Sequence, residues 1–142
     1  MRLDPDFLRA RALDVRRHVE LARGMAAMND DAFMADERTQ YALAHVLLVA
    51  IESAAAMCTH VSARALQRAP DSYVACIDEL VAADILEVDL AAKLRAMMRF
   101  RNVLVHQYWD IDMWRVLGYA REHVDDLEAF VDAIGLYVAE SL

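Results

Sequence analysis

Four polar side chains that could take part in acid–base or phosphate chemistry fall within eight residues: Arg101, Asn102, His106 and Tyr108. Histidine is the side chain best matched to proton transfer near neutral pH, because its unperturbed pKa is about 6.5. Arginine offers a permanent positive charge and a planar set of donors for a phosphate group. The segment therefore holds the residue types that a reaction at a phosphate requires.

The surrounding sequence predicts that this segment lies on a helix, where Arg101 interrupts an apolar stripe. Helical spacing places the following residues on one face: Leu90, Leu94, Met97, Arg101, Leu104 and Tyr108. A guanidinium on such a face is costly unless an anion or a hydrogen-bonding group contacts it. Two interpretations stay open, a structural ion pair with a carboxylate such as Glu52 and a site for a phosphate. Tyr108 likewise could simply complete the core.

The spacing of the polar residues constrains how they can cooperate. Asn102 and His106 are four residues apart, so on a helix they share a face and could form a hydrogen bond. Arg101 and His106 are five residues apart, which separates them by about 140° around an ideal helix. They could meet at one phosphate only if the helix loosens near His106 or if two subunits face each other. The spacing therefore favours a dimeric site.

Start and stop signals divide the rest of the chain into about five helices. Asp4 followed by Pro5 predicts the cap and first position of a helix that the polar run 29–31 ends. A second helix begins between residues 32 and 39 and continues to about residue 68. Residues 70–72 then end that helix and cap a third, which is followed by a short connection.

Two further signals complete the predicted helices. Asp89 is expected to cap the fourth helix, and the last helix is expected to begin near Asp112. Apolar residues that step by four and three then continue in the last helix from Met113 to Val138. No alternation typical of a strand competes with this pattern. The sequence thus predicts one all-α domain over residues 1–142, an antiparallel up-and-down bundle.

Composition supports one folded domain and limits the kinds of partner that the protein is expected to bind. The chain of 142 residues is 58% hydrophobic, with only three glycines and two prolines. Its net charge of −8 argues against broad electrostatic binding of nucleic acid, although a local basic site stays possible. The charged runs 9–17 and 121–128 are expected to be solvated helix faces, and their basic residues could also contact an RNA backbone.

Other features of the sequence indicate where the chain resides and what it lacks. Cys58 and Cys76 match neither a CxxC motif nor a disulfide framework, so we expect buried free thiols in a reducing cytoplasm. The start of the chain lacks an apolar signal core. The most apolar segment, residues 41–58, contains His45 and Glu52 and is expected to be a core helix rather than a membrane span.

No metal-binding pair of histidines and no nucleotide-cradling loop is found, so neither a metal nor a cofactor is expected.

The segment "RNVLVHQY" resembles a known family motif. It matches the RX4HXY pattern of the HepT-like HEPN ribonucleases, which are the toxins of HepT–MntA toxin–antitoxin pairs. The segment "RTQYALAHVLLVAIESA", residues 38–54, is similar to the long second helix of that family, and "SYVACIDELVAADIL", residues 72–86, to its third. The resemblance covers nearly the whole chain in order, so it is much more specific than the short motif alone.

This resemblance implies a fold, an activity and partners. The family fold is an all-α up-and-down bundle that is usually homodimeric. By resemblance, Arg101 and His106 would carry metal-independent RNA cleavage, and Asn102 would be the polar residue that follows the arginine. Tyr108 would be the tyrosine that an MntA-like nucleotidyltransferase antitoxin modifies with AMP. The expected protein is a cytoplasmic toxin without a cofactor, whose partners are a second copy, the antitoxin and RNA.

Two alternatives belong to other functional classes. A non-catalytic HEPN module could bind RNA or nucleotide and act as a scaffold for a nucleotidyltransferase. A plain helical dimerisation protein would need no polar site at all. The complete set of Arg101, His106 and Tyr108 favours the ribonuclease over the scaffold. A plain dimerisation protein would leave an arginine on an apolar stripe without explanation.

Overall fold

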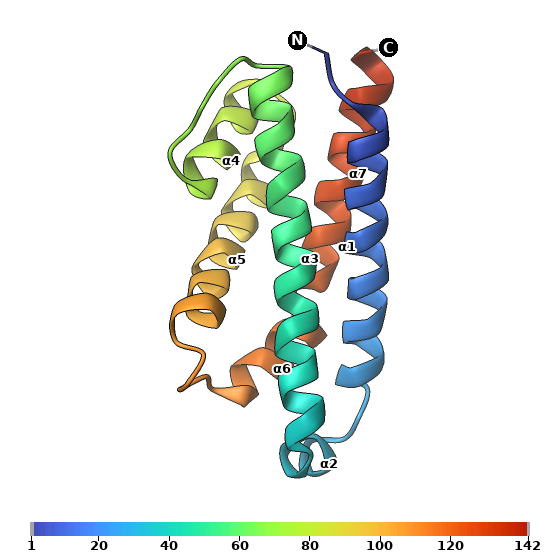
Figure 1. Ribbon diagram of the computed structural model, residues 1–142, viewed down its shortest axis with the longest axis vertical. Coiled ribbons are helices and arrows are strands. Elements are labelled where there is room, and N and C mark those ends of the chain that lie inside the picture. The colour runs from blue at the N-terminus through green and yellow to red at the C-terminus, as the bar shows by residue number, and fades with distance from the viewer. Residues whose placement is uncertain (1, 142) are drawn as a thin grey trace.

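The computed structural model describes residues 2–141, and all regular secondary structure within them is helical. The seven helices are α1 (Pro5–Ala26), α2 (Asp30–Ala35), α3 (Glu37–Arg64), α4 (Tyr73–Ala82), α5 (Val88–His106), α6 (Met113–Glu122) and α7 (Val124–Ser141). The long helices alternate in direction, and α3 lies between α1 and α7 on one side and α4 and α5 on the other (Figure 1). The prediction of an all-α antiparallel bundle is confirmed.

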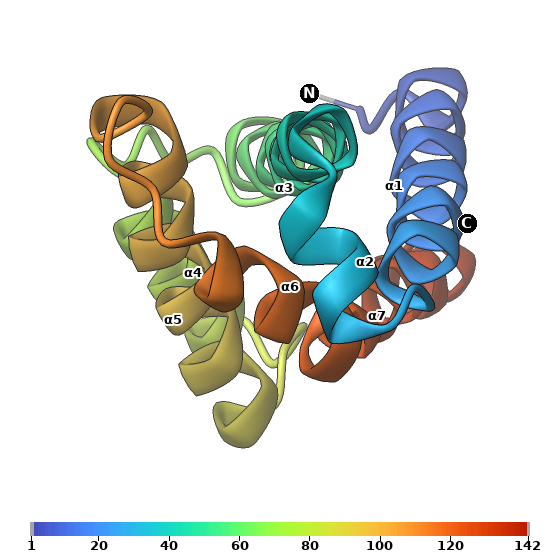
Figure 2. The ribbon, with the colours of Figure 1, turned by 90° about the horizontal axis from the view of Figure 1, so that it is seen from below.

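Residues 2–141 form seven helices rather than the predicted number of about five. One difference is the short helix α2. Asn29 caps it, because its side-chain oxygen accepts a hydrogen bond from the backbone N–H of Ala32 at 2.8 Å. The other is a break at His123, which divides the predicted last helix into α6 and α7. Helix α6 lies across the end of the bundle (Figure 2). Both helices bury apolar side chains, so the apolar spacing continues through the break and does not reveal it.

Most of the predicted helix ends are found in the structure. The Asp4 carboxylate accepts hydrogen bonds from the backbone N–H groups of Asp6 and Phe7 at 3.1 Å, and Pro5 begins α1. Ser72 caps α4, and Asp112 caps α6. These polar side chains satisfy donors that the first turn of a helix leaves unpaired. The local sequence therefore determines where these three helices begin.

Two predicted helix ends are wrong. Helix α5 begins at Val88 with Glu87 at the cap position, so Asp89 lies in the first turn, where a carboxylate still favours the positive helix end. Helix α3 ends at Arg64 rather than near residue 68. The chain turns there through Gln67, whose φ of 54° is left-handed. The N–H of Arg68 then donates to the carbonyl of Ser62 at 3.0 Å, which closes the turn.

Helix α3 is the central core helix. It is long and apolar enough to cross a membrane by length and composition alone, with a mean hydropathy of 1.7 over its most apolar window. Packing accounts for that hydrophobicity, since 56% of the window is buried inside the bundle. Leu43, Leu47 and Ile51 on α3 are fully buried. The expectation of a core helix therefore agrees with the packing of α3.

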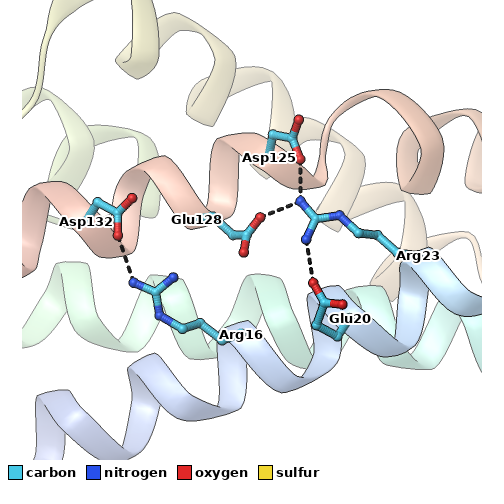
Figure 3. Close-up of polar contacts among 6 residues, drawn as sticks. All are labelled: Arg16, Glu20, Arg23, Asp125, Glu128 and Asp132. Carbon is cyan, nitrogen blue, oxygen red and sulfur yellow. Dashed lines mark hydrogen bonds and ion pairs between the residues drawn. The ribbon is translucent and has the colours of Figure 1, made fainter.

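Ion pairs join α1 to α7 along one side of the bundle (Figure 3). Arg23 of α1 binds both Asp125 and Glu128 of α7. Arg16 of α1 binds Asp132 of α7 at 2.7 Å. The runs 9–17 and 121–128 stay largely exposed, as expected for solvated helix faces, and Arg16, Asp125 and Glu128 within them also pair with charges on the facing helix.

Arg121 of α6 ties the end of the bundle together. Its guanidinium donates to the carbonyl oxygens of Ala26 at 3.0 Å and Met28 at 2.8 Å. It also binds the Asp30 carboxylate at 2.6 Å. The last carbonyls of a helix lack partners within the helix, and a cation there is favourable. Arg121 thereby fixes the connection between α1 and α2 against α6.

Candidate functional site

Helix α5 holds Arg101 beside α3. The neighbouring side chains Phe100 and Leu104 are 2% and 5% exposed, so they anchor this part of α5 in the core. The Arg101 side chain is 20% exposed, and its Nε donates to Oε1 of Glu52 at 2.5 Å. The ion pair that the sequence suggested is therefore present. The hydrogen bond to Glu52 raises the pKa of Arg101 above its ordinary value, which strengthens a charge already permanent at neutral pH.

The guanidinium of Arg101 also forms part of an open pocket. Its central carbon lies 5.4 Å from the centre of the Tyr73 ring, a cation–π contact, and Nη1 donates to Oδ1 of Asn102 at 3.1 Å. The pocket has a volume of about 440 Å³ and is lined by Thr59, Pro70, Asp71, Ser72, Tyr73, Val74, Cys76, Met98, Arg101 and Asn102. Glu52 accepts a hydrogen bond from Nε of Arg101, and Asn102 accepts one from a terminal nitrogen of the same guanidinium. The other terminal nitrogen can donate to an anion in the pocket.

His106 lies at the end of α5 and is exposed. Helix α5 stays regular to this residue, and the N–H of Gln107 still donates to the carbonyl of Val103 at 2.9 Å. The helix therefore does not loosen to bring His106 towards Arg101. The two side chains diverge by about 140° around the helix, as its regular geometry requires. Asn102 contacts Arg101 rather than His106.

Tyr108 lies outside α5, so the suggestion that it completes the apolar stripe is wrong. The helix ends at His106, and Tyr108 is 67% exposed in the following turn. Its ring packs edge-to-face on Trp109, with ring centres 5.1 Å apart. The Tyr108 side chain is therefore accessible from solvent.

Tyr108 lines a second recess, which lies between the 108–113 segment, the end of α2 and the start of α3. It has a volume of about 370 Å³ and is lined by Met34, Ala35, Glu37, Gln40, Tyr41, Tyr108, Trp109, Asp110, Ile111 and Met113. Tyr41 and Trp109 were not identified as site residues from the sequence. Trp109 is adjacent to Tyr108 in the chain, but nothing in the sequence indicates that Tyr41 lies nearby. The fold alone brings Tyr41 to this recess.

The arrangement offers a fixed cation in a pocket and an exposed imidazole beyond it on the same helix. Within residues 2–141, no group of three His, Cys, Asp or Glu side chains is placed to hold a metal ion. The Arg101 pocket can bind a phosphate, whereas proton transfer by His106 at that same phosphate needs a different relative position of the two residues. A second copy of the chain could supply that position.

Comparisons with known proteins identify similar sequences and folds. A family model for HepT-like ribonucleases matches residues 15–134. A search of curated proteins finds no match. Among solved structures, the tri-AMPylated HEPN toxin of Shewanella oneidensis in complex with MNT antitoxin is 20% identical, with a TM-score of 0.84. That match covers 92% of this chain and 98% of the toxin.

Two more structures share the fold. A toxin–antitoxin structure with AMP-PNP is 20% identical with a TM-score of 0.80, and the match covers 91% of this chain and 98% of that one. YutE, a cytosolic protein of unknown function from Bacillus subtilis, is 21% identical with a TM-score of 0.77, and the match covers 94% of this chain and 92% of YutE. At such identities these likenesses establish the fold.

Proposed function

The chain belongs to the HepT-like ribonuclease family, and we propose from this that it is the toxin of a toxin–antitoxin pair that cleaves RNA without a metal ion. The observation that carries the proposal is the Arg101 pocket. An intact RX4HXY segment places the guanidinium there, held from one side by Glu52 and facing Tyr73. Fold-level similarity to toxins in toxin–antitoxin structures supports the biological setting.

In this proposal two types of residue carry out different parts of RNA cleavage. A base removes the proton of a ribose 2′-hydroxyl, whose oxygen attacks the adjacent phosphorus, and an acid protonates the departing 5′-oxygen. Arg101 stabilises the negative charge that develops on the phosphate oxygens. His106 supplies the proton transfer, since imidazole can act as base or acid near neutral pH. Asn102 holds one terminal nitrogen of the guanidinium in place.

A homodimer would complete this site. Because α5 is regular from Arg101 to His106, one copy of the helix directs the two side chains away from each other. Two copies packed through the 101–108 segments would bring His106 of each close to the Arg101 pocket of the other, and the two imidazoles could divide the acid and base roles. Light scattering at micromolar concentration should give twice the chain mass. A monomer that cleaves RNA would contradict this arrangement.

The proposed antitoxin is an MntA-like nucleotidyltransferase that transfers AMP to Tyr108. The accessible phenol beside the 370 Å³ recess supports this role, since a tyrosine oxygen can serve as a nucleophile once deprotonated. The similar toxin from Shewanella oneidensis is AMPylated. AMP on Tyr108 would add negative charge and bulk near His106 and hinder RNA. We place the pair in the cytoplasm, where RNA and ATP are available.

The competing function is a non-catalytic HEPN scaffold that binds RNA or nucleotide beside its nucleotidyltransferase. The Arg101 pocket alone would serve such binding, so activity decides between the two. Purified protein is incubated with total RNA in EDTA, next to His106→Ala at equal concentration. Cleavage by the wild type and none by His106→Ala supports the ribonuclease. Binding of RNA by both proteins, with cleavage by neither, supports the scaffold.

A further inference from the structure

Two thiols face each other behind the Arg101 pocket. Sγ of Cys58 on α3 lies 2.9 Å from Sγ of Cys76 on α4, and both side chains are buried. A disulfide bond has a length of about 2.05 Å, so the two sulfurs need less than about 1 Å of relative movement to become bonded. The two cysteines are the only ones in the sequence. Packing of α4 on α3 thus presents a dithiol pair ready for oxidation.

The two sulfurs differ in their surroundings. Cys76 lines the 440 Å³ pocket together with Thr59, Tyr73 and Arg101. Cys58 instead borders a small gap of about 10 Å³ among apolar side chains that include Ile77 and Leu94. A small oxidant that enters the pocket therefore meets Cys76 before it can meet Cys58. Cys76 is therefore the sulfur on the pocket side of the pair, although both residues are buried.

The two thiols also differ in the direction in which their pKa is shifted. The hydrogen bond from the Cys58 thiol lowers the pKa of Cys76, because it stabilises the thiolate. That shared bond and then burial raise the pKa of Cys58, which retains its proton. The thiolate is the nucleophilic form of cysteine. Cys76 thereby both lines the pocket and has the more stabilised thiolate.

We propose that Cys58 and Cys76 are a reversible oxidation site for peroxides, with Cys76 as the attacking thiol and Cys58 as the resolving thiol. The Cys76 sulfur attacks one peroxide oxygen, the O–O bond breaks, and a sulfenic acid forms as one water leaves after protonation. The Cys58 sulfur then attacks the sulfenic sulfur, the S–O bond breaks, and a second water leaves. The pair loses two hydrogen atoms in total while hydrogen peroxide is reduced to two waters. A thiol reductant restores both cysteines.

Oxidation would reach the proposed RNA site through the helix that carries Cys76. Tyr73, whose ring faces Arg101, precedes Cys76 by one helical turn on α4. A disulfide would fasten α4 covalently to α3, and with it this wall of the pocket. The two thiols would react in this way whether or not the protein cleaves RNA.

Intact-mass measurement of the folded, reduced protein with hydrogen peroxide tests the pair. The expected product is a single chain lighter by two hydrogen atoms, with no thiol left for alkylation in denaturant and a raised Tm. Addition of reductant should return the original mass and Tm. Two thiols that stay free under these conditions, or a disulfide found only between two chains, would overturn the proposal.

Single substitutions test the roles of the two sulfurs. In Cys58→Ser, peroxide should leave a Cys76 sulfenic acid that dimedone traps, whereas in Cys76→Ser the remaining Cys58, which does not line the pocket, should stay unlabelled. In urea both variants should react alike, because the fold creates the difference. Equal trapping in the two folded variants would refute the assignment of Cys76. Circular dichroism checks folding, and Cys58→Ala with Cys76→Ala replaces the serine variants if either one unfolds.

Discussion

Nε of Arg101 on α5 lies 2.5 Å from Oε1 of Glu52 on α3, so a helix of the core orients the one guanidinium in the candidate pocket. This ion pair leaves Arg101 with further hydrogen-bond donors. Glu52 binds the guanidinium at Nε, and the terminal nitrogens lie towards Asn102 and the pocket. Structural pairing and phosphate binding are therefore compatible at Arg101. Glu52 acts as a positioning residue in this interpretation.

Glu52→Ala should lower RNA cleavage by between about tenfold and a hundredfold, because a misplaced guanidinium stabilises the phosphate less well. Glu52→Gln should lose less, since its amide oxygen can still accept from Nε. The free energy of unfolding should change by less than about 1 kcal/mol in Glu52→Gln, as the carboxylate is 38% exposed. Kinetics with a defined RNA and urea denaturation measure both effects. Unchanged cleavage in Glu52→Ala would refute the positioning role.

Arg101→Lys should lose at least about a hundredfold in cleavage, because an ammonium group cannot reproduce the planar donors of a guanidinium. Arg101→Ala should lose more. Arg99→Ala is the matched control, since Arg99 is exposed on the same helix and lies outside the pocket. Single-turnover cleavage and far-UV circular dichroism are measured for all three variants. If Arg101→Lys cleaves like the wild type, Arg101 contributes only charge.

The sequence predicts the fold best where a local signal is sufficient. Asp4, Ser72 and Asp112 cap helices because each cap depends on neighbouring backbone donors. The apolar spacing does not indicate the break at His123, because it is the same on both sides of it, although the chain changes direction there (Figure 1). At the site, Arg101 on an apolar stripe predicts a partner such as a carboxylate, and Glu52, the example that the sequence suggests, is that partner.

Other contacts of the site depend on tertiary packing. The cation–π contact of Arg101 with Tyr73 and the position of Tyr41 near Tyr108 both follow from how helices cross. Eighteen residues of sequence separate Cys58 from Cys76, and no spacing rule indicates that their sulfurs meet. Pattern reasoning therefore identifies single residues but not the recesses that several elements build together.

Tyr108→Phe should remain able to cleave RNA and should escape silencing by the cognate nucleotidyltransferase, because it lacks the acceptor oxygen. Tyr41→Phe is the matched control, since Tyr41 is also exposed and lines the same recess. Intact mass after co-expression should show AMP on the wild type and on Tyr41→Phe but none on Tyr108→Phe. Unmodified wild type that the partner still silences would show that neutralisation works by binding alone.

Stability should fall in mild acid through His60. Its Nε2 accepts a hydrogen bond from the N–H of Asp4 at 3.0 Å, which requires a neutral ring, and its ring stacks on Phe7. Burial, followed by the charge of Arg64, lowers the pKa of His60. The unfolded chain therefore binds this proton more tightly. The free energy of unfolding should decrease as pH falls from about 6.5 through the lower folded pKa.

Urea denaturation between about pH 7 and pH 5 measures this dependence. His60→Gln should show a smaller decrease than the wild type, because an amide can accept the Asp4 bond and does not titrate in this range. His45→Gln is the matched control, an exposed substitution on the same helix, and should keep the wild-type slope. Equal slopes in all three proteins would show that His60 is not responsible.

The ion pairs between α1 and α7 join segments that are made at opposite ends of synthesis. Arg23 is made early, but its partners Asp125 and Glu128 follow 102 and 105 residues later. On the ribosome, α1 must therefore wait for almost the entire polypeptide before its charged side is neutralised and its apolar side is fully packed. A nascent chain cannot reach this fold before translation is nearly complete. Under the proposed function, such late closure would delay RNA cleavage until the chain is released.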